Sequence, residues 1–199
     1  MIRSYQDTEI EDLPLFPIVA QALERAKQRA SHRDLHFLFE GAKHLSIHLD
    51  RRILNDVLDG LLKNAIENTP DEGLIRISSE QKDADTLVMV EDFGIGITKE
   101  NQAFIFDGFF HTQETDLYTS KSPYDFYAGG KGLDLHRMKL YGQRFGFNLS
   151  VESRRCVYIP TDRDLCPGRI SACSHCKGPE DCYASGGSTF TVSFPREQE

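Results

Sequence analysis

The sequence predicts a two-layer α/β (α+β) sandwich in which helices pack on one face of a β-sheet. Amphipathic stretches with helical spacing and segments of alternating polarity support this prediction. The strongest helix follows Asp50, an N-cap residue, and ends before Pro70. Its apolar residues recur every three or four positions, which places them on one face.

The other elements are predicted in chain order from the same two periodicities and from the turn residues between them. Further helices are expected over 17–30, 99–105 and 132–145. Strands are expected over 34–40, 44–50, 74–80, 86–92, 147–153 and 188–194. A turn at 71–73 joins the main helix to the strands that follow it.

Composition limits the classes of function. The 199 residues carry a net charge of −8, which disfavours nucleic acid as a partner. The longest apolar run, 13–23, contains two prolines and is shorter than the roughly 20 residues that a membrane span needs. We expect an arm or linker over 1–12 and one domain over 13–199, with no direct membrane insertion and a cytoplasmic location.

Two short motifs invite comparison with eukaryotic-type protein kinases. These are HRDL at 32–35 and DFG at 92–94. The catalytic loop of those kinases requires Asn where position 39 holds Phe, and no glycine-rich loop precedes it here. The sequence therefore excludes that family.

Four other segments occur in a fixed order: LLKNAIENTP at 61–70, VEDFGIGIT at 90–98, IFDGFFHT at 105–112 and AGGKGLDLHRMK at 128–139. Together they resemble the N, G1, F and G2 boxes of the catalytic ATP-binding domain (HATPase_c) of two-component sensor histidine kinases. Wider relatives include the gyrase, mismatch-repair and heat-shock chaperone ATPases and the anti-sigma-factor serine kinases. The resemblance implies the Bergerat ATP-binding fold, with a mixed β-sheet, and the cofactors ATP and Mg²⁺.

The residue chemistry agrees with this resemblance. Asp92 ends a predicted strand and can accept a hydrogen bond from the exocyclic amine of adenine, while a flat ring lies over Gly94 and Gly96. Guanine presents an oxygen at the same place, so Asp92 selects ATP over GTP. An isolated Asp-x-Gly is more often a simple turn.

Magnesium and phosphate are expected at the other end of the nucleotide. The amide oxygen of Asn64 suits Mg²⁺ that is held mainly by phosphates. Glycines directly before a helix offer backbone N–H groups to phosphate, and the polar stretch 111–130 resembles a mobile lid anchored by Phe109 and Phe110. No catalytic side chain is assigned. The implied nucleotide contacts are Asn64, Asn68, Asp92, Gly94, Gly96, Ile97, Phe109, Gly130, Lys131, Gly132 and Leu133.

Several positions depart from the family pattern. Gly60 stands where hydrolysing relatives carry a general-base Glu, Glu67 stands where kinases often carry a basic residue, and Asp134 replaces a glycine. No histidine is followed by Glu or Asp, the pattern of the phosphoacceptor site. We therefore expect a partner phosphoacceptor histidine domain, in the same full-length protein or separate, and a response regulator. The alternatives are an anti-sigma-type serine kinase, an ATPase, or a degenerate module that senses nucleotide or redox state.

All five cysteines fall in one insert, 156–182. Cys166, Cys173, Cys176 and Cys182 are candidate ligands of Zn²⁺ or an iron–sulfur cluster, with Cys156 left over. Packed free thiols or disulfides are the equally weighted alternative.

Overall fold

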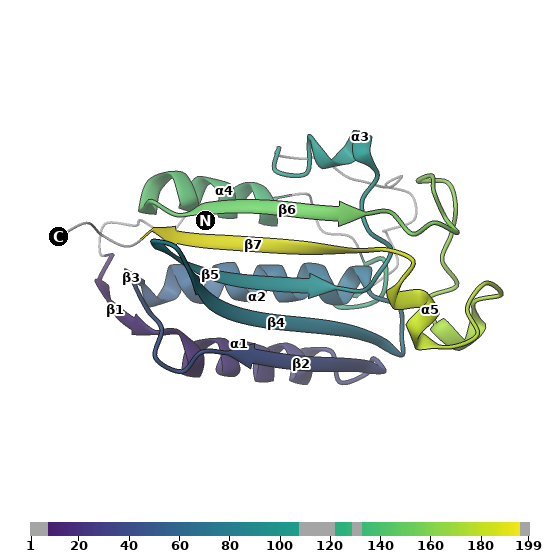
Figure 1. Cartoon of the computed structure of the whole chain (residues 1–199), viewed down its shortest axis with the longest axis horizontal. Helices are drawn as coiled ribbons and strands as arrows, with labels where there is room; N and C mark the ends of the chain where they lie inside the picture. The colour runs from purple at the N-terminus through teal and green to yellow at the C-terminus, as the bar shows by residue number, and fades with distance from the viewer. Residues whose placement is uncertain (1–7, 108–121, 129–132, 196–199) are drawn as a thin grey trace.

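The computed structural model describes residues 8–107, 122–128 and 133–195. Its main layer is a five-stranded sheet with the strand order β2-β4-β5-β7-β6 (Figure 1). Only β2 and β4 pair in parallel, so the sheet is mixed as predicted. In that order the strands are Leu35–Gly41, Gly73–Lys82, Asp85–Asp92, Gly187–Pro195 and Asn148–Arg154.

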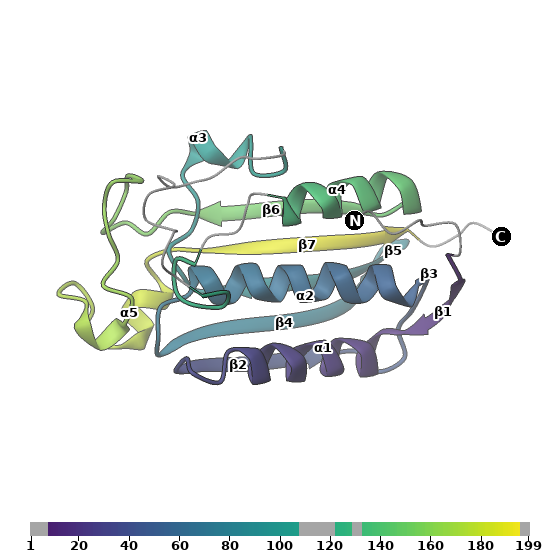
Figure 2. The same cartoon turned by 180° about the vertical axis from the view of Figure 1, so that it is seen from behind.

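Three helices form the second layer on one face of this sheet (Figures 1 and 2). They are α1 (Leu15–Arg29), α2 (Arg51–Asn68) and α4 (Asp134–Phe145). Short helical turns lie outside this layer, namely α3 (Lys99–Gln102), η2 (Ile170–Ala172) and α5 (Pro179–Tyr183). The predicted two-layer sandwich is confirmed.

The N-terminal segment differs from the prediction. Residues 10–14 form β1 (Ile10–Pro14), which pairs antiparallel with β3 (Ser46–Asp50) in a separate two-stranded sheet. The predicted arm over 1–12 therefore runs into a strand. This strand lacks the alternation of apolar and polar residues that predicts a strand, because only Leu13 of β1 is buried.

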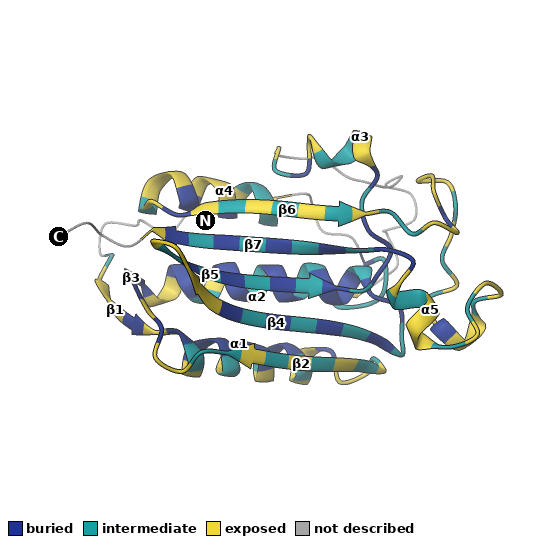
Figure 3. Ribbon diagram, in the orientation of Figure 1, coloured by how far each residue is buried: buried dark blue, intermediate teal, exposed yellow. Residues whose placement is uncertain are grey.

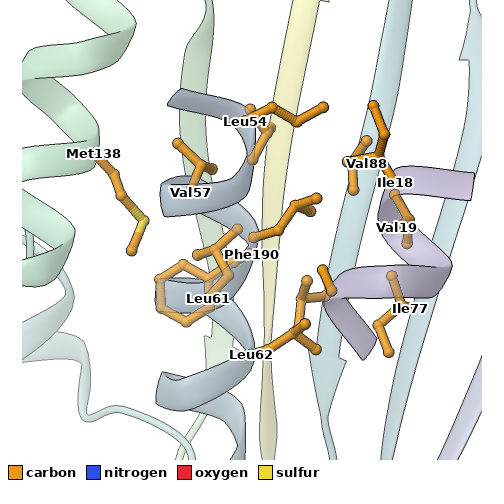
Figure 4. Close-up of a cluster of buried hydrophobic side chains, with 14 of the residues drawn as sticks. Ile18, Val19, Leu54, Val57, Leu61, Leu62, Ile77, Val88, Met138 and Phe190 are labelled. Carbon is orange, nitrogen blue, oxygen red and sulfur yellow. The ribbon is translucent and has the colours of Figure 1, made fainter. Parts of the chain in front are cut away.

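The core lies between α2 and the sheet (Figure 4). Leu54, Val57, Leu61 and Leu62 of α2 are almost completely buried and lie beside Phe190 of β7. Burial of one such side chain contributes about 1.5–3 kcal/mol to the free energy of folding. Along β4, β5 and β7 buried and less buried residues alternate, because only one sheet face carries helices (Figure 3).

The N-terminus of α2 is capped as predicted. The side chain of Asp50 accepts a hydrogen bond of 2.8 Å from the backbone N–H of Arg52 and one of 2.9 Å from that of Glu9. Hydrogen bonds from Arg52 and Glu9 outweigh burial and lower the pKa of Asp50 to about 2. The cap therefore also fixes the chain that leads into β1. Within the described ranges, no helix is both long and apolar enough to cross a bilayer.

A glycine ends α4 in the left-handed conformation, in which other residues are strained. Gly146 has φ of 77° and donates its N–H to the carbonyl of Gly142 at 2.9 Å. A Cβ there would meet no heavy atom within 4 Å, so a substitution tests the backbone alone. We predict that Gly146→Ala lowers the free energy of unfolding by about 1 kcal/mol, because L residues are strained in this region. The midpoint of urea unfolding measures the loss.

Gly146→Asn is the matched control, since Asn tolerates the left-handed conformation better than Ala. It is expected to lose less than Gly146→Ala. Equal losses for the two variants would contradict a backbone origin.

Candidate functional site

Asp92 is the last residue of β5 and points to the helical side of the sheet. Val88, Val90 and Asp92 alternate along the strand as its buried positions, and Asp92 is only 1% exposed. Its Oδ1 accepts the backbone N–H of Gly94 at 3.2 Å. The strand and this turn therefore hold the carboxyl group in one orientation.

Burial raises the pKa of Asp92 to about 7, although hydrogen bonds from Gly94 and Ser188 act in the opposite direction. The charge assumed in the sequence analysis is thus only partly present at neutral pH. A donor that reaches this carboxylate stabilises its ionised form and lowers its pKa.

The loop after Asp92 lies directly against the C-terminal end of α2. The N–H of Ile95 donates to the carbonyl oxygen of Asn68 at 3.1 Å. A Cβ on Gly94 would lie 2.0 Å from the same oxygen, so only glycine fits there. This contact brings the end of β5 next to the helix that carries Asn64.

Gly96 is required for a different neighbour. Its φ is 63°, and a Cβ would lie 1.9 Å from the carbonyl oxygen of Arg154 at the end of β6. The next residue, Ile97, donates its N–H to the Oγ of Ser153 at 2.8 Å. Both predicted glycines therefore have a packing role, which the sequence analysis did not identify; an aromatic ring stacked over them stays a prediction.

Asn64 and Asn68 lie one turn apart on the same face of α2. The Nδ2 of Asn68 donates to the backbone oxygen of Asn64 at 2.8 Å and contacts its Oδ1 at 3.3 Å. Because the carbonyl oxygen of Asn68 also accepts the N–H of Ile95, the helix end that carries Asn64 lies next to the loop that follows Asp92. A shared role of Asn64 and Asp92 in binding one ligand stays a prediction.

Three charged side chains gather where α2 meets the start of α4. The Nζ of Lys63 lies 3.0 Å from Asp134 Oδ2 and 3.9 Å from Glu67 Oε1. Burial lowers the pKa of Lys63, but the two carboxylates outweigh it and leave the pKa raised. Burial raises the pKa of Glu67 against the attraction of Lys63. The positive charge of Lys63 is thus shared between the carboxylates of Asp134 and Glu67.

The described part of the predicted lid, 122–128, is attached to α2. Tyr124 donates its N–H to Glu67 Oε1 at 3.1 Å, and Tyr127 donates its N–H to the backbone oxygen of Glu67 at 2.8 Å. Leu133 precedes α4 and is 37% exposed. The other predicted contacts Phe109, Phe110, Gly130, Lys131 and Gly132 lie outside the described residues, as does the lid over 111–121.

Arg33 organises the same end of α2. Its guanidinium pairs with Asp71 at 2.7 Å and donates to the backbone oxygens of Thr69 at 2.8 Å and Tyr124 at 3.0 Å. The side chain is 5% exposed. The local sequence does not indicate this role, because only folding brings the 69–71 and 122–128 segments around Arg33.

The insert contains the five cysteines as free thiols. In the part of the chain that the structure describes, no three His, Cys, Asp or Glu residues are placed to hold one metal ion. Cys166, Cys173, Cys176 and Cys182 therefore stay candidate ligands of Zn²⁺ or an iron–sulfur cluster, a possibility that this arrangement does not support.

Comparisons with known proteins agree with this geometry. Residues 49–198 match the family described as histidine kinase-, DNA gyrase B- and HSP90-like ATPases. The sensor-like histidine kinase SenX3 of Mycobacterium tuberculosis is 31% identical over 128 residues, which are 64% of this chain and 29% of SenX3. The chain thus corresponds to less than a third of that relative's length.

Two solved structures share the fold at lower identity. Full-length ShkA in complex with AMPPNP aligns with a TM-score of 0.67 at 17% identity, over 97% of this chain and 32% of ShkA. Histidine kinase ThkA in complex with the response regulator TrrA aligns with a TM-score of 0.61 at 20% identity, over 94% of this chain and 42% of that one.

The raised pKa of Asp92 has a consequence for stability. Below the unfolded pKa of about 4 the carboxyl is protonated in both states and costs nothing. As the pH rises towards 7 the unfolded state loses its proton first, so the folded wild type is progressively destabilised. We predict that Asp92→Asn, which cannot ionise, gains stability relative to wild type by on the order of a few kcal/mol between pH 4 and pH 7. Chemical unfolding of both proteins over this range, without nucleotide, measures the difference, and parallel curves would contradict it.

Proposed function

The chain belongs to the histidine kinase-, DNA gyrase B- and HSP90-like ATPase family, and we propose that it is the ATP-binding catalytic domain of a sensor histidine kinase. In this role it transfers the γ-phosphoryl group of Mg-ATP to a histidine on another domain. The observation that carries the proposal is the junction of Asp92, the 93–97 loop and the C-terminal end of α2.

Asp92 is proposed to recognise adenine. A buried carboxylate accepts a hydrogen bond from the exocyclic amine of the base, and this bond offsets part of the cost of ionising Asp92. Guanine would place an oxygen against the same group. Discrimination therefore depends on the ionised carboxylate and is expected to be strongest above pH 7.

Asn64 is proposed to hold Mg²⁺ through its amide oxygen. One protein oxygen suffices where phosphate oxygens and water complete the coordination of a hard cation. Bound Mg²⁺ would neutralise charge on the triphosphate. Lys63 precedes Asn64 in the sequence and pairs with Asp134 at the start of α4, so it offsets the negative charge of Asp134 at that end.

The chain's own contribution to transfer is then positioning and charge stabilisation. Position 60 holds glycine, and a Cβ there would lie 2.2 Å from the Cε of Met138. No side chain at this position can activate water, which favours transfer to an acceptor over hydrolysis. The serine kinase and ATPase alternatives are accordingly less well supported.

The partners are proposed from relatives. ThkA has been solved with a response regulator, and by analogy we propose one as the final phosphate acceptor. The first acceptor is a phosphoacceptor histidine domain, in the same protein or separate. We further propose that residues 13–199 act as one domain in the cytoplasm, where ATP is available.

Asp92→Ala tests the base-recognition step. We predict that ATP affinity, measured by calorimetry with Mg²⁺ at pH 8, falls about 10- to 100-fold, and that the preference for ATP over GTP is lost. Glu91→Ala is the matched control, since Glu91 lies on the other sheet face and pairs with Arg76 at 2.9 Å. Glu91→Ala is expected to keep the wild-type ATP affinity and the wild-type preference for ATP over GTP. Absence of ATP binding by the wild type would refute the proposed function.

Asn64→Ala tests the metal step. Mg²⁺ is expected to strengthen ATP binding by wild type relative to EDTA, and we predict that this gain is largely lost in Asn64→Ala while affinity in EDTA changes little. Asn55→Ala is the control on the same helix, because Asn55 accepts a hydrogen bond from Arg25 at 2.8 Å and faces α1. If Asn64→Ala retains the full gain from Mg²⁺, Asn64 is not the ligand.

A further inference from the structure

We propose that Cys173 and Cys176 form a reversible dithiol–disulfide site, and that its oxidation state alters nucleotide binding at the adjacent site. The ligand class is a small disulfide or dithiol of the surrounding redox buffer. The first half of this proposal is independent of the proposed function, and the second half rests on it.

Backbone geometry places these two residues within disulfide range. The N–H of Cys176 donates to the carbonyl oxygen of Cys173 at 3.3 Å, which closes a four-residue turn. The ends of such a turn lie less than about 7 Å apart, and Cα atoms of disulfides are about 4.4–6.8 Å apart. The pair needs little backbone movement to join.

A third thiol lies next to this pair. The Cys176 thiol is within hydrogen-bonding reach of Cys173 and of Cys182 on α5. All five cysteines are half-buried and line one cavity of about 560 Å³, so a small reagent can reach them.

Burial raises the pKa of Cys176 to about 11, and the neighbouring Cys173 adds to this effect. Burial also raises the pKa of Cys182, to about 12. These thiols are therefore protonated at neutral pH, and attack by the minor thiolate is slow. Because the exchange is slow, the site responds to sustained changes in the ratio of thiol to disulfide in the surrounding buffer and does not respond to brief ones.

The chemistry is a two-step exchange. One cysteine thiolate attacks a sulfur of the small disulfide, forms a mixed disulfide and releases the first small thiol. The second cysteine then attacks the protein sulfur of the mixed disulfide, forms the Cys173–Cys176 bond and releases the second small thiol. Two electrons and two protons pass from the protein to the small disulfide.

Contacts connect the insert to the nucleotide site. The ring of Tyr183, next to Cys182, lies tilted against that of Phe93, next to Asp92, with the ring centres 5.4 Å apart. Tyr183 also donates its hydroxyl to the carbonyl oxygen of Glu72 at 3.1 Å. The N–H of Cys156 donates to the carbonyl of Ile95 at 2.9 Å. Figure 1 shows α5 at the end of the sheet where β5 terminates. A change in the turn can therefore reach the loop that holds Asp92.

The insert is also bonded to the turn behind α2. Residues 168–170 bridge Asp71 through N–H bonds of 2.9 and 3.1 Å, and Arg169 pairs with Glu72 at 2.7 Å. The same Asp71 pairs with Arg33. Two routes therefore lead from the thiol turn to the C-terminal end of α2.

Equilibration of the purified chain in glutathione buffers of stepped redox ratio tests the thiol site, with acid quenching, alkylation and tryptic peptide mapping. Cleavage after Arg169 and Lys177 leaves Cys173 and Cys176 on one peptide, 170–177. The expected product at oxidising ratios is this peptide without two hydrogen atoms, restored by dithiothreitol. Persistence of two alkylated thiols, or only glutathione adducts, would overturn the proposal. So would an isolated protein that carries stoichiometric zinc or iron and whose thiols react only after chelation.

ATP affinity of the reduced and oxidised protein tests the coupling. We expect a difference of about fivefold or more in wild type, which disappears in Cys173→Ser and persists in the control Cys156→Ser. Equal affinities in a protein with the mapped disulfide would overturn the coupling. Failure of the reduced protein to bind ATP would refute the proposed function instead, while peptide mapping would still decide the thiol site.

Discussion

The contact between the carbonyl oxygen of Asn68 and the N–H of Ile95 is the constraint on which the site depends. The last turn of a helix leaves carbonyl groups without partners inside the helix, and the 93–97 loop supplies a donor for one of them. Gly94 allows this approach because any Cβ would collide with the same oxygen. As a result, the end of β5 and the C-terminal end of α2, which are distant in the sequence, lie against each other.

This arrangement buries the carboxyl group of Asp92, where its ionisation costs free energy. Asp92 is buried, and its raised pKa means that its ionised form is disfavoured until a donor arrives. Glu67, also buried, is tolerated because Lys63 attracts it and Tyr124 donates to it. The two carboxyl groups differ in their partners: Glu67 pairs with Lys63 and accepts the N–H of Tyr124, whereas the hydrogen bonds that Asp92 accepts from Gly94 and Ser188 do not offset its burial. Carboxyl groups whose pKa is raised by burial in this way are typical of binding sites.

The insert extends the sheet end that carries the site. Through Asp71, Glu72 and Ile95 it bonds to the same backbone that Arg33 and Asn68 hold. A family fold with a short connection at this place would lack these contacts. The chain therefore combines a nucleotide-binding architecture with a thiol-lined cavity, and the two share one set of loops.

The sequence by itself determined the elements whose cause is local. The apolar spacing and the capping Asp50 specify α2, and alternation specifies the strands. The ordered motifs indicate the family and predict Asp92 and Asn64 as ligand contacts. Only the tertiary structure decided why Gly94 and Gly96 are glycines, what Arg33 binds, that residues 10–14 form a strand, and that Asp92 is partly protonated. Each of these depends on groups distant in the sequence that meet in space, because close approach and burial are properties of the packed chain and leave no periodic pattern along it.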